Sequence, residues 1–129
     1  MAERPLSPHL SIYRFGYTMS LSILHRITGV ALSVALIAGV AWLLGAAGGE
    51  ESYRRTLTVL AAWPFKLAFG LALLALVYHF CNGLRHLAWD AGWGFERPAA
   101  KRSALIVIVA TVILAAVCLY FAFCPAARS

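Results

Sequence analysis

Residues 103–124 read SALIVIVATVILAAVCLYFAFC, a run of 22 residues without a single charged side chain. About 20 apolar residues in an α-helix, each rising 1.5 Å, cross the ~30 Å hydrocarbon core of a bilayer. Pro125 follows directly and ends the run, because proline disrupts a continuing helix. We therefore expect a transmembrane helix over about 103–124 and an all-α membrane protein.

The composition of the whole chain agrees with a membrane protein. Its 129 residues are 62% hydrophobic and 12% charged, whereas an ordinary globular domain is about 25% charged. The formal net charge is +6, but the basic residues lie at the ends of the apolar runs, which argues against nucleic-acid binding. The length predicts a single domain, 1–129, and the three cysteines show no metal-ligand spacing.

Two further apolar runs precede residues 103–124 in the chain. They cover about 21–47 and about 61–89, and Pro64 lies near the start of the second, where a missing N–H does least harm. Both are long enough to cross a membrane. Residues 52–61 between them are amphipathic, and we interpret them as an outward extension of the second helix. The chain therefore has three expected transmembrane helices.

Polar segments flank the three expected helices: an N-terminal segment, 1–20, and a loop, 91–102, rich in glycine, proline and charge. Together with the adjoining helix ends they hold seven of the eleven basic residues, so the positive-inside rule places both in the cytoplasm and the C-terminus in the periplasm. No secretory signal is visible in the first twenty residues, and we expect insertion into a bacterial inner membrane through the chain's own helices. The seven residues are Arg4, Arg14, Arg26, Arg85, Arg97, Lys101 and Arg102.

The second apolar run closes with residues 79–90, which read HFCNGLRHLAWD. Two histidines, an arginine and an aspartate lie here, where a lipid-facing helix carries none. Ionisable groups inside a membrane are costly and mark a functional site by default. His79 precedes His86 by seven residues, almost two helical turns, so both face the same side and His79 lies ~10.5 Å deeper.

Several other polar residues belong to the cytoplasmic ends of the first and second helices. We call this set the polar shelf and expect it to lie at one level near the membrane surface. His79 lies deeper than the shelf, and His25 lies too shallow to match it. The shelf consists of Ser22, His25, Arg26, Arg85 and His86.

A single imidazole at membrane depth suits haem, because the macrocycle is apolar and carries two anionic propionates at one edge. His79 would bind the iron, the shelf cations would meet the propionates, and Gly83 would let a flat ring lie close to the helix. In the alternative interpretation, His79 hydrogen-bonds a neighbouring helix, and Arg85 and Asp90 are interfacial charges. Two histidines on one helix cannot supply both faces of a haem, so a second axial ligand would come from a partner chain.

Three stretches carry a resemblance to a known family: residues 4–14 (RPLSPHLSIYR), 22–29 (SILHRITG) and 79–92 (HFCNGLRHLAWDAG). With the three-helix layout, they resemble the cytochrome b556 membrane-anchor subunits of succinate dehydrogenase, in particular the mitochondrial and alphaproteobacterial branch. The resemblance implies a complex of a flavoprotein subunit, an iron–sulfur subunit and two membrane anchors that share one haem b. A chain of this kind would not oxidise succinate by itself.

The resemblance also implies roles for individual residues. His79 matches the axial iron ligand, and the opposite ligand would belong to the second anchor subunit. Ser22 and Arg26 match the residues that line the ubiquinone site. His25 is associated with the haem propionate edge, where Arg26 would also act, and His86 is placed near the propionates.

Two further functions remain open at this point. A fumarate reductase anchor of the same family would work in the reverse direction, and the sequence does not decide between the two directions. A purely structural anchor, whose histidines bind no cofactor, is the alternative from a different class.

Overall fold

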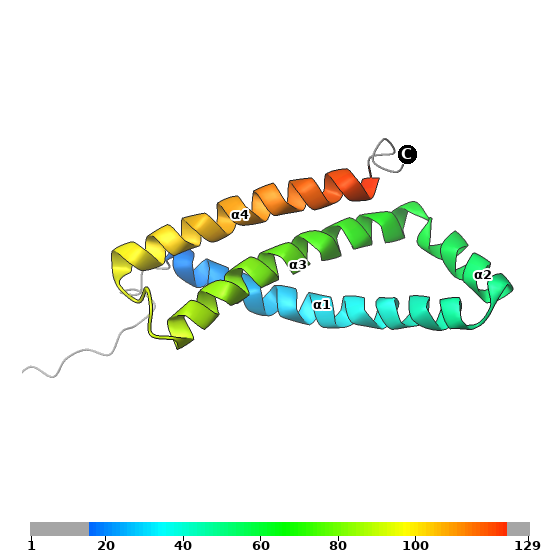
Figure 1. Cartoon of the computed structure of the whole chain (residues 1–129), viewed down its shortest axis with the longest axis horizontal. Helices are drawn as coiled ribbons and strands as arrows, with labels where there is room; N and C mark the ends of the chain where they lie inside the picture. Colours follow the sequence, from blue (N-terminus) through cyan, green and yellow to red (C-terminus); the bar gives the residue numbers. More distant parts are fainter. Residues whose placement is uncertain (1–15, 124–129) are drawn as a thin grey trace, which may run out of the picture.

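The computed structural model describes residues 16–123, and within that range every regular element is a helix. Residues 4–14 of the first family stretch lie outside the described residues. Figure 1 shows the four helices in chain order. They are α1 (Tyr17–Ala47), α2 (Glu50–Leu60), α3 (Trp63–Asp90) and α4 (Arg97–Phe123).

Three of these helices are long and apolar enough to cross a membrane. The candidate spans are Thr18–Ala47, Trp63–Asp90 and Arg97–Ala122. The expected all-α membrane fold is therefore confirmed. Helical spans satisfy every backbone N–H and C=O within the segment, which lipid cannot do.

Helix α2 is a separate helix, so the expectation that residues 52–61 extend the second span was wrong. The chain turns at Ala62, whose backbone is extended, and α3 begins with Pro64 in its first turn. Pro64 has no N–H to continue the hydrogen-bond ladder of a preceding helix, which explains the break. Helix α2 instead folds back on α1, where Gly45 leaves room for Thr56.

The loop predicted over 91–102 is also shorter than expected, because α4 begins at Arg97. Pro98 lies in the first turn of α4, where its missing N–H has no partner to lose. The turn itself uses Gly92 and Gly94, whose φ angles of 87° and 80° favour glycine. The connection between α3 and α4 therefore covers only residues 91–96.

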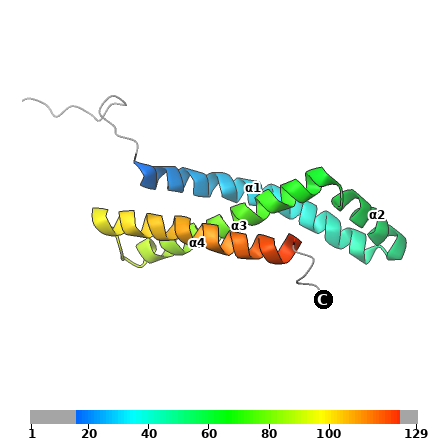
Figure 2. The same ribbon diagram turned by 90° about the horizontal axis from the view of Figure 1, so that it is seen from above.

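Helix α3 packs against both α1 and α4, whereas α1 and α4 touch each other little. Figures 1 and 2 show α4 running antiparallel beside α3. The amino-terminal part of α1 crosses the carboxyl-terminal half of α3. From this crossing, α1 and α3 diverge toward α2. The amino ends of α1 and α4 and the carboxyl end of α3 thus lie at one end of the molecule.

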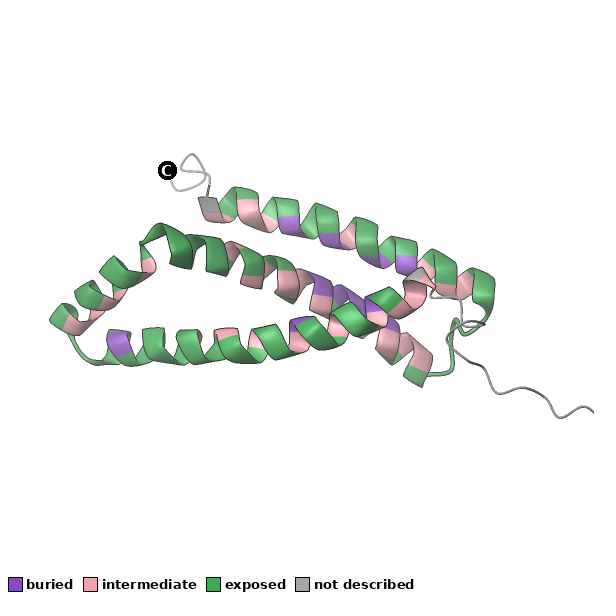
Figure 3. Ribbon diagram, turned by 180° about the vertical axis from the view of Figure 1, so that it is seen from behind, coloured by how far each residue is buried: buried purple, intermediate pink, exposed green. Residues whose placement is uncertain are grey.

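The buried core gathers near the crossing of α1 and α3 and along α4, as the burial colours of Figure 3 show. One polar contact ties the crossing together: the Tyr78 hydroxyl donates to the Leu21 carbonyl at 2.6 Å. Most large apolar side chains elsewhere on the three spans remain exposed, as expected for surfaces that meet lipid or another subunit. The core residues are Leu21, Tyr78, Cys81, Ala104 and Val107.

Candidate functional site

Three histidines meet where α1 crosses α3. The rings of His25 and His79 stack with centroids 3.9 Å apart and planes within 11°. The His86 ring lies 4.8 Å from His25, tilted by 37°. The expectation that His25 is too shallow to match His79 was therefore wrong, because the crossing of the two helices brings these rings to one level.

His79 is oriented by two contacts on one of its ring nitrogens. Its Nδ1 lies 3.1 Å from the carbonyl oxygen of His25 and 3.2 Å from the Thr28 hydroxyl. A carbonyl oxygen can only accept, so Nδ1 carries the proton, and in the neutral imidazole Nε2 then keeps its lone pair. No hydrogen bond to Nε2 is recorded within residues 16–123. A backbone carbonyl on one imidazole nitrogen is the usual way in which proteins orient the other nitrogen toward a metal.

These contacts include the hydrogen bond to a neighbouring helix that the alternative interpretation required. That bond uses Nδ1 of His79 and leaves Nε2 for a ligand role, so the two interpretations are compatible in this geometry. His25 differs, because its Nδ1 is buried and has no hydrogen-bond partner among the described residues. An unpaired buried nitrogen costs about 1–3 kcal/mol, which indicates a site that residues 16–123 alone do not complete.

Gly29 provides the space for the His79 ring. A Cβ atom at position 29 would lie 3.1 Å from Cε1 of His79, a closer approach than side chains ordinarily make. The Gly-to-Ala change would therefore push the imidazole away from α1. Gly83, expected to accommodate a flat cofactor, instead faces His25, and an added Cβ would lie 3.8 Å from His25 Cε1, an ordinary contact.

We expect Gly29→Ala to displace His79 and weaken its hydrogen bond to His25, destabilising the fold by about 1–3 kcal/mol. Gly39→Ala is the matched control on the same helix, because nothing lies within 4 Å of its added Cβ. The control should be neutral or stabilising by up to about 1 kcal/mol, since alanine favours a helix. Thermal unfolding of the detergent-solubilised protein measures both. Equal effects at the two positions would contradict the role given to Gly29.

Arg85 occupies a different environment from the interfacial shelf that we expected. It is only 5% exposed. Its Nε donates to the Ser103 hydroxyl at 3.0 Å, and its terminal nitrogens donate to the Ala100 carbonyl and the Asn82 side-chain oxygen at 3.3 and 3.4 Å. The guanidinium also lies 4.0 Å from the centre of the Trp89 ring. Arg85 therefore connects α3 to the first turns of α4, which corrects its placement among cofactor-facing cations.

His86 lies toward the carboxyl end of α3, next to this connection. Its Nδ1 is 3.0 Å from the Asn82 carbonyl, and the Trp89 ring meets it edge-on at 5.5 Å. His79, His25, His86 and Trp89 thus form a continuous row of rings from the crossing toward the end of α3.

Ser22 and Arg26 lie one turn apart on α1, on the side of the helix that also carries His25. Ser22 is half-buried and Arg26 is exposed. Within residues 16–123 neither residue contacts the histidine rings, and neither lines the hollow at Thr18 and Arg97 or the one at Ser20 and Ile27. The structure therefore brings His25, His79 and His86 together and leaves Ser22 and Arg26 beside them on an open surface.

Sequence reasoning missed three residues that shape the site. Thr28 contacts His79, Tyr78 fixes the crossing, and Asn82 is fully buried beside Arg85 and His86. Thr28 follows directly on the polar residues of α1, and Asn82 lies between the two α3 histidines. Thr28 and Asn82 could have been identified from the sequence as uncharged polar residues that lie among the candidate site residues.

Comparison with known proteins matches the chain to one protein family and to relatives of that family. Residues 1–118 match the family described as succinate dehydrogenase/fumarate reductase transmembrane subunit. The succinate dehydrogenase cytochrome b556 subunit of Rickettsia felis is 40% identical over 112 residues, covering 87% of both chains. That of Paracoccus denitrificans is 37% identical over 121 residues, covering 94% of this chain and 93% of the relative. The mitochondrial cytochrome b560 subunit of Homo sapiens is 42% identical over 117 residues, covering 87% and 68%.

Proposed function

The chain belongs to the succinate dehydrogenase/fumarate reductase transmembrane subunit family, as a membrane-anchor cytochrome b subunit, and from this we propose its specific role. It binds haem b together with a second anchor subunit and contributes to a site where ubiquinone is reduced. Electrons reach this site from succinate through a flavoprotein and an iron–sulfur subunit. In this proposal succinate oxidation belongs to the flavoprotein subunit and not to this chain.

The observation that carries the haem proposal is the orientation of His79. Its Nδ1–H donates to the His25 carbonyl, and its Nε2 lone pair remains for iron. The residues present therefore fit haem b. When bound, haem b would supply a one-electron redox centre within the membrane.

The second axial ligand is assigned to the partner anchor. The His25 ring lies face to face with the His79 ring and nearly parallel to it, so His25 would not share the iron with His79. In this proposal His25 would hold the propionate edge. Arg26 supplies a positive charge there, and His86 completes the edge in this proposal.

The quinone site is assigned to Ser22 and Arg26. The Ser22 hydroxyl donates to a quinone carbonyl, and the Arg26 guanidinium stabilises negative charge that develops on that oxygen during reduction. The acidic residues that the structure describes, Glu50, Glu51, Asp90 and Glu96, are all exposed. The protons that quinone reduction consumes therefore come from water or from partner subunits, not from a buried carboxylate in residues 16–123.

The proposed orientation places the amino end of α1 and the α3–α4 connection in the cytoplasm of a bacterium, with the C-terminus in the periplasm. The positive-inside rule supports it. The histidine row then leads from the membrane interior to the side where the soluble subunits bind. We propose succinate oxidation rather than fumarate reduction as the physiological direction, and the names of the relatives support this choice.

We test the quinone site with Ser22→Ala and Arg26→Ala in the assembled complex. Succinate-dependent quinone reduction should fall roughly tenfold for Ser22→Ala and a hundredfold for Arg26→Ala, because each removes a group aimed at the reacting oxygen. Reduction of a soluble dye by the flavoprotein should be unchanged. Ser33→Ala, further along α1, is the control and should leave both activities intact. Equal loss of quinone and dye reduction would indicate failed assembly, and unchanged quinone reduction would exclude the assignment.

A further inference from the structure

A hollow of about 420 Å³ lies between the amino ends of α1 and α4, away from the histidine row. Thr18 and Arg97 line it, and they are also the first residues of two candidate membrane spans. The hollow therefore lies at the level where the hydrocarbon core meets the headgroups. Among residues 16–123, those that line it are Gly16, Thr18, Phe95, Arg97, Ala100 and Lys101.

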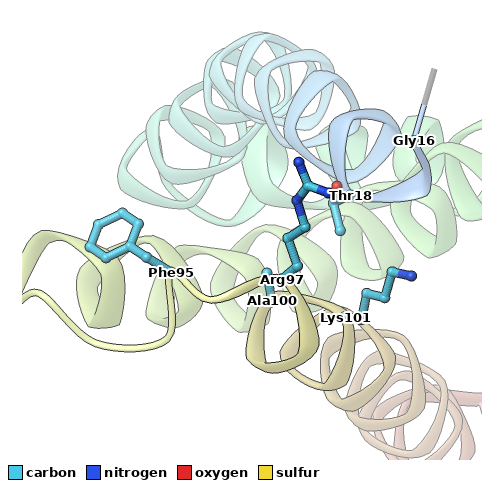
Figure 4. Close-up of a pocket in the computed structure, with 6 residues that line it drawn as sticks. All are labelled: Gly16, Thr18, Phe95, Arg97, Ala100 and Lys101. Atoms are coloured by element: carbon cyan, nitrogen blue, oxygen red, sulfur yellow. The ribbon is translucent and has the colours of Figure 1, made fainter. Parts of the chain in front are cut away.

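Two cations dominate the lining. Arg97 and Lys101 lie one turn apart on α4, and Figure 4 shows Arg97 extending toward Thr18 on α1. Both are exposed, and the ion pairs recorded within residues 16–123 all lie on α2. Glu96 precedes Arg97 but pairs with neither cation. With the Thr18 hydroxyl as a further donor, the lining favours an anionic oxygen-rich group, such as a phosphate.

The surface next to the two cations favours a lipid over a soluble anion as the ligand of the hollow. At helical spacing, the α4 face that carries Lys101 continues with Leu105, Ile108 and Val112, which are all exposed. A cationic pair at the membrane boundary therefore opens onto an apolar stripe that runs into the hydrocarbon core. Phe95, 66% exposed, adds an interfacial aromatic ring at the edge of the hollow.

We propose that this hollow binds the phosphate headgroup of an anionic phospholipid, with an acyl chain lying along the α4 stripe. Arg97 and Lys101 contact the phosphate oxygens from one helix, and Thr18 donates from the other. The lipid thereby bridges α1 and α4, two spans that otherwise touch each other little. This site is separate from the proposed haem and quinone residues and stands independently of them.

Native mass spectrometry of the purified membrane complex that contains this chain tests the proposal. Phosphatidylglycerol is titrated as the anionic probe and phosphatidylcholine as the neutral one. The wild-type complex should bind phosphatidylglycerol more tightly, and Arg97→Gln with Lys101→Gln should weaken its tightest binding roughly tenfold or more. The charge-preserving pair Arg97→Lys with Lys101→Arg should retain most of the binding.

The matched control is Arg54→Gln with Arg55→Gln on α2, at the opposite end of the spans, where each arginine already pairs with its own glutamate. This pair should leave phosphatidylglycerol binding unchanged. Unchanged binding in the α4 double variant, or equal loss in the α2 control, would overturn the proposal. Displacement of the lipid by inorganic phosphate at matched ionic strength would reassign the hollow to a soluble anion. Dissociation of another subunit with unaltered lipid binding would reassign it to a protein contact.

Discussion

Replacing His79 with alanine should abolish the low-spin haem signal of the complex. The substitution removes the Nε2 lone pair proposed for the iron. His86 also has its Nδ1 on a backbone carbonyl, but it lies about two helical turns from His79, toward the carboxyl end of α3. His25 lies on the other helix, and its ring is displaced by 3.9 Å from the lost imidazole, so we do not expect it to take over the iron. Any haem that remains would be held by the partner ligand alone and would be high-spin.

The measurement for this variant is total haem per complex combined with low-temperature electron paramagnetic resonance, which distinguishes low-spin from high-spin iron. His86→Ala is the control from the same helix face, and it should keep low-spin haem. A His79→Ala complex with an unaltered low-spin signal would exclude His79 as the ligand. Loss of low-spin haem in His86→Ala alone would transfer the assignment to His86.

Replacing Arg85 with alanine should destabilise the packing of α4 on α3 by about 2–4 kcal/mol. The guanidinium donates to Ser103 and Ala100 on α4 and to Asn82 on α3, and its loss leaves buried acceptors without these donors. The midpoint of thermal unfolding in detergent should fall by several degrees. Arg85→Lys should recover only part of the loss, because an ammonium lacks the planar fork that reaches several acceptors.

Arg55→Ala provides the comparison for Arg85. Arg55 forms an ion pair with Glu51, but its side chain is 78% exposed, so its removal should cost at most about 1 kcal/mol. Similar stability losses in the two variants would contradict the connecting role of Arg85. If the Arg85→Ala complex stayed stable but lost haem or quinone reduction, Arg85 would act at the cofactor, as first expected, and not in joining α3 to α4.

The membrane architecture was predictable because it depends on local properties of the sequence. An uncharged run such as 103–124 requires burial in lipid whatever its neighbours are, and a span needs about 20 residues. The helix starts were less predictable. Pro64 is compatible with both a first turn and a kink, and Pro98 lay in a segment whose glycines and charges suggested a longer loop.

The site was only partly predictable, because its geometry depends on how two helices cross. The seven-residue spacing of His79 and His86 correctly predicts that both side chains lie on the same face of α3. The contact between His25 and His79 joins residues 54 positions apart, and it depends on the close approach of α1 and α3 at Gly29. The burial of Arg85 likewise depends on a partner, Ser103, that lies 18 residues away.

The absorption spectrum of the purified complex tests the central claim most directly. A haem b held by His79 and a ligand from the partner anchor should give, on reduction, the sharp α band of a low-spin b-type cytochrome. Addition of succinate in the absence of quinone measures whether electrons from the soluble subunits reach that haem. A complex that contains all its subunits, reduces dye with succinate and shows no haem band would contradict the account and leave this chain as an anchor without a cofactor.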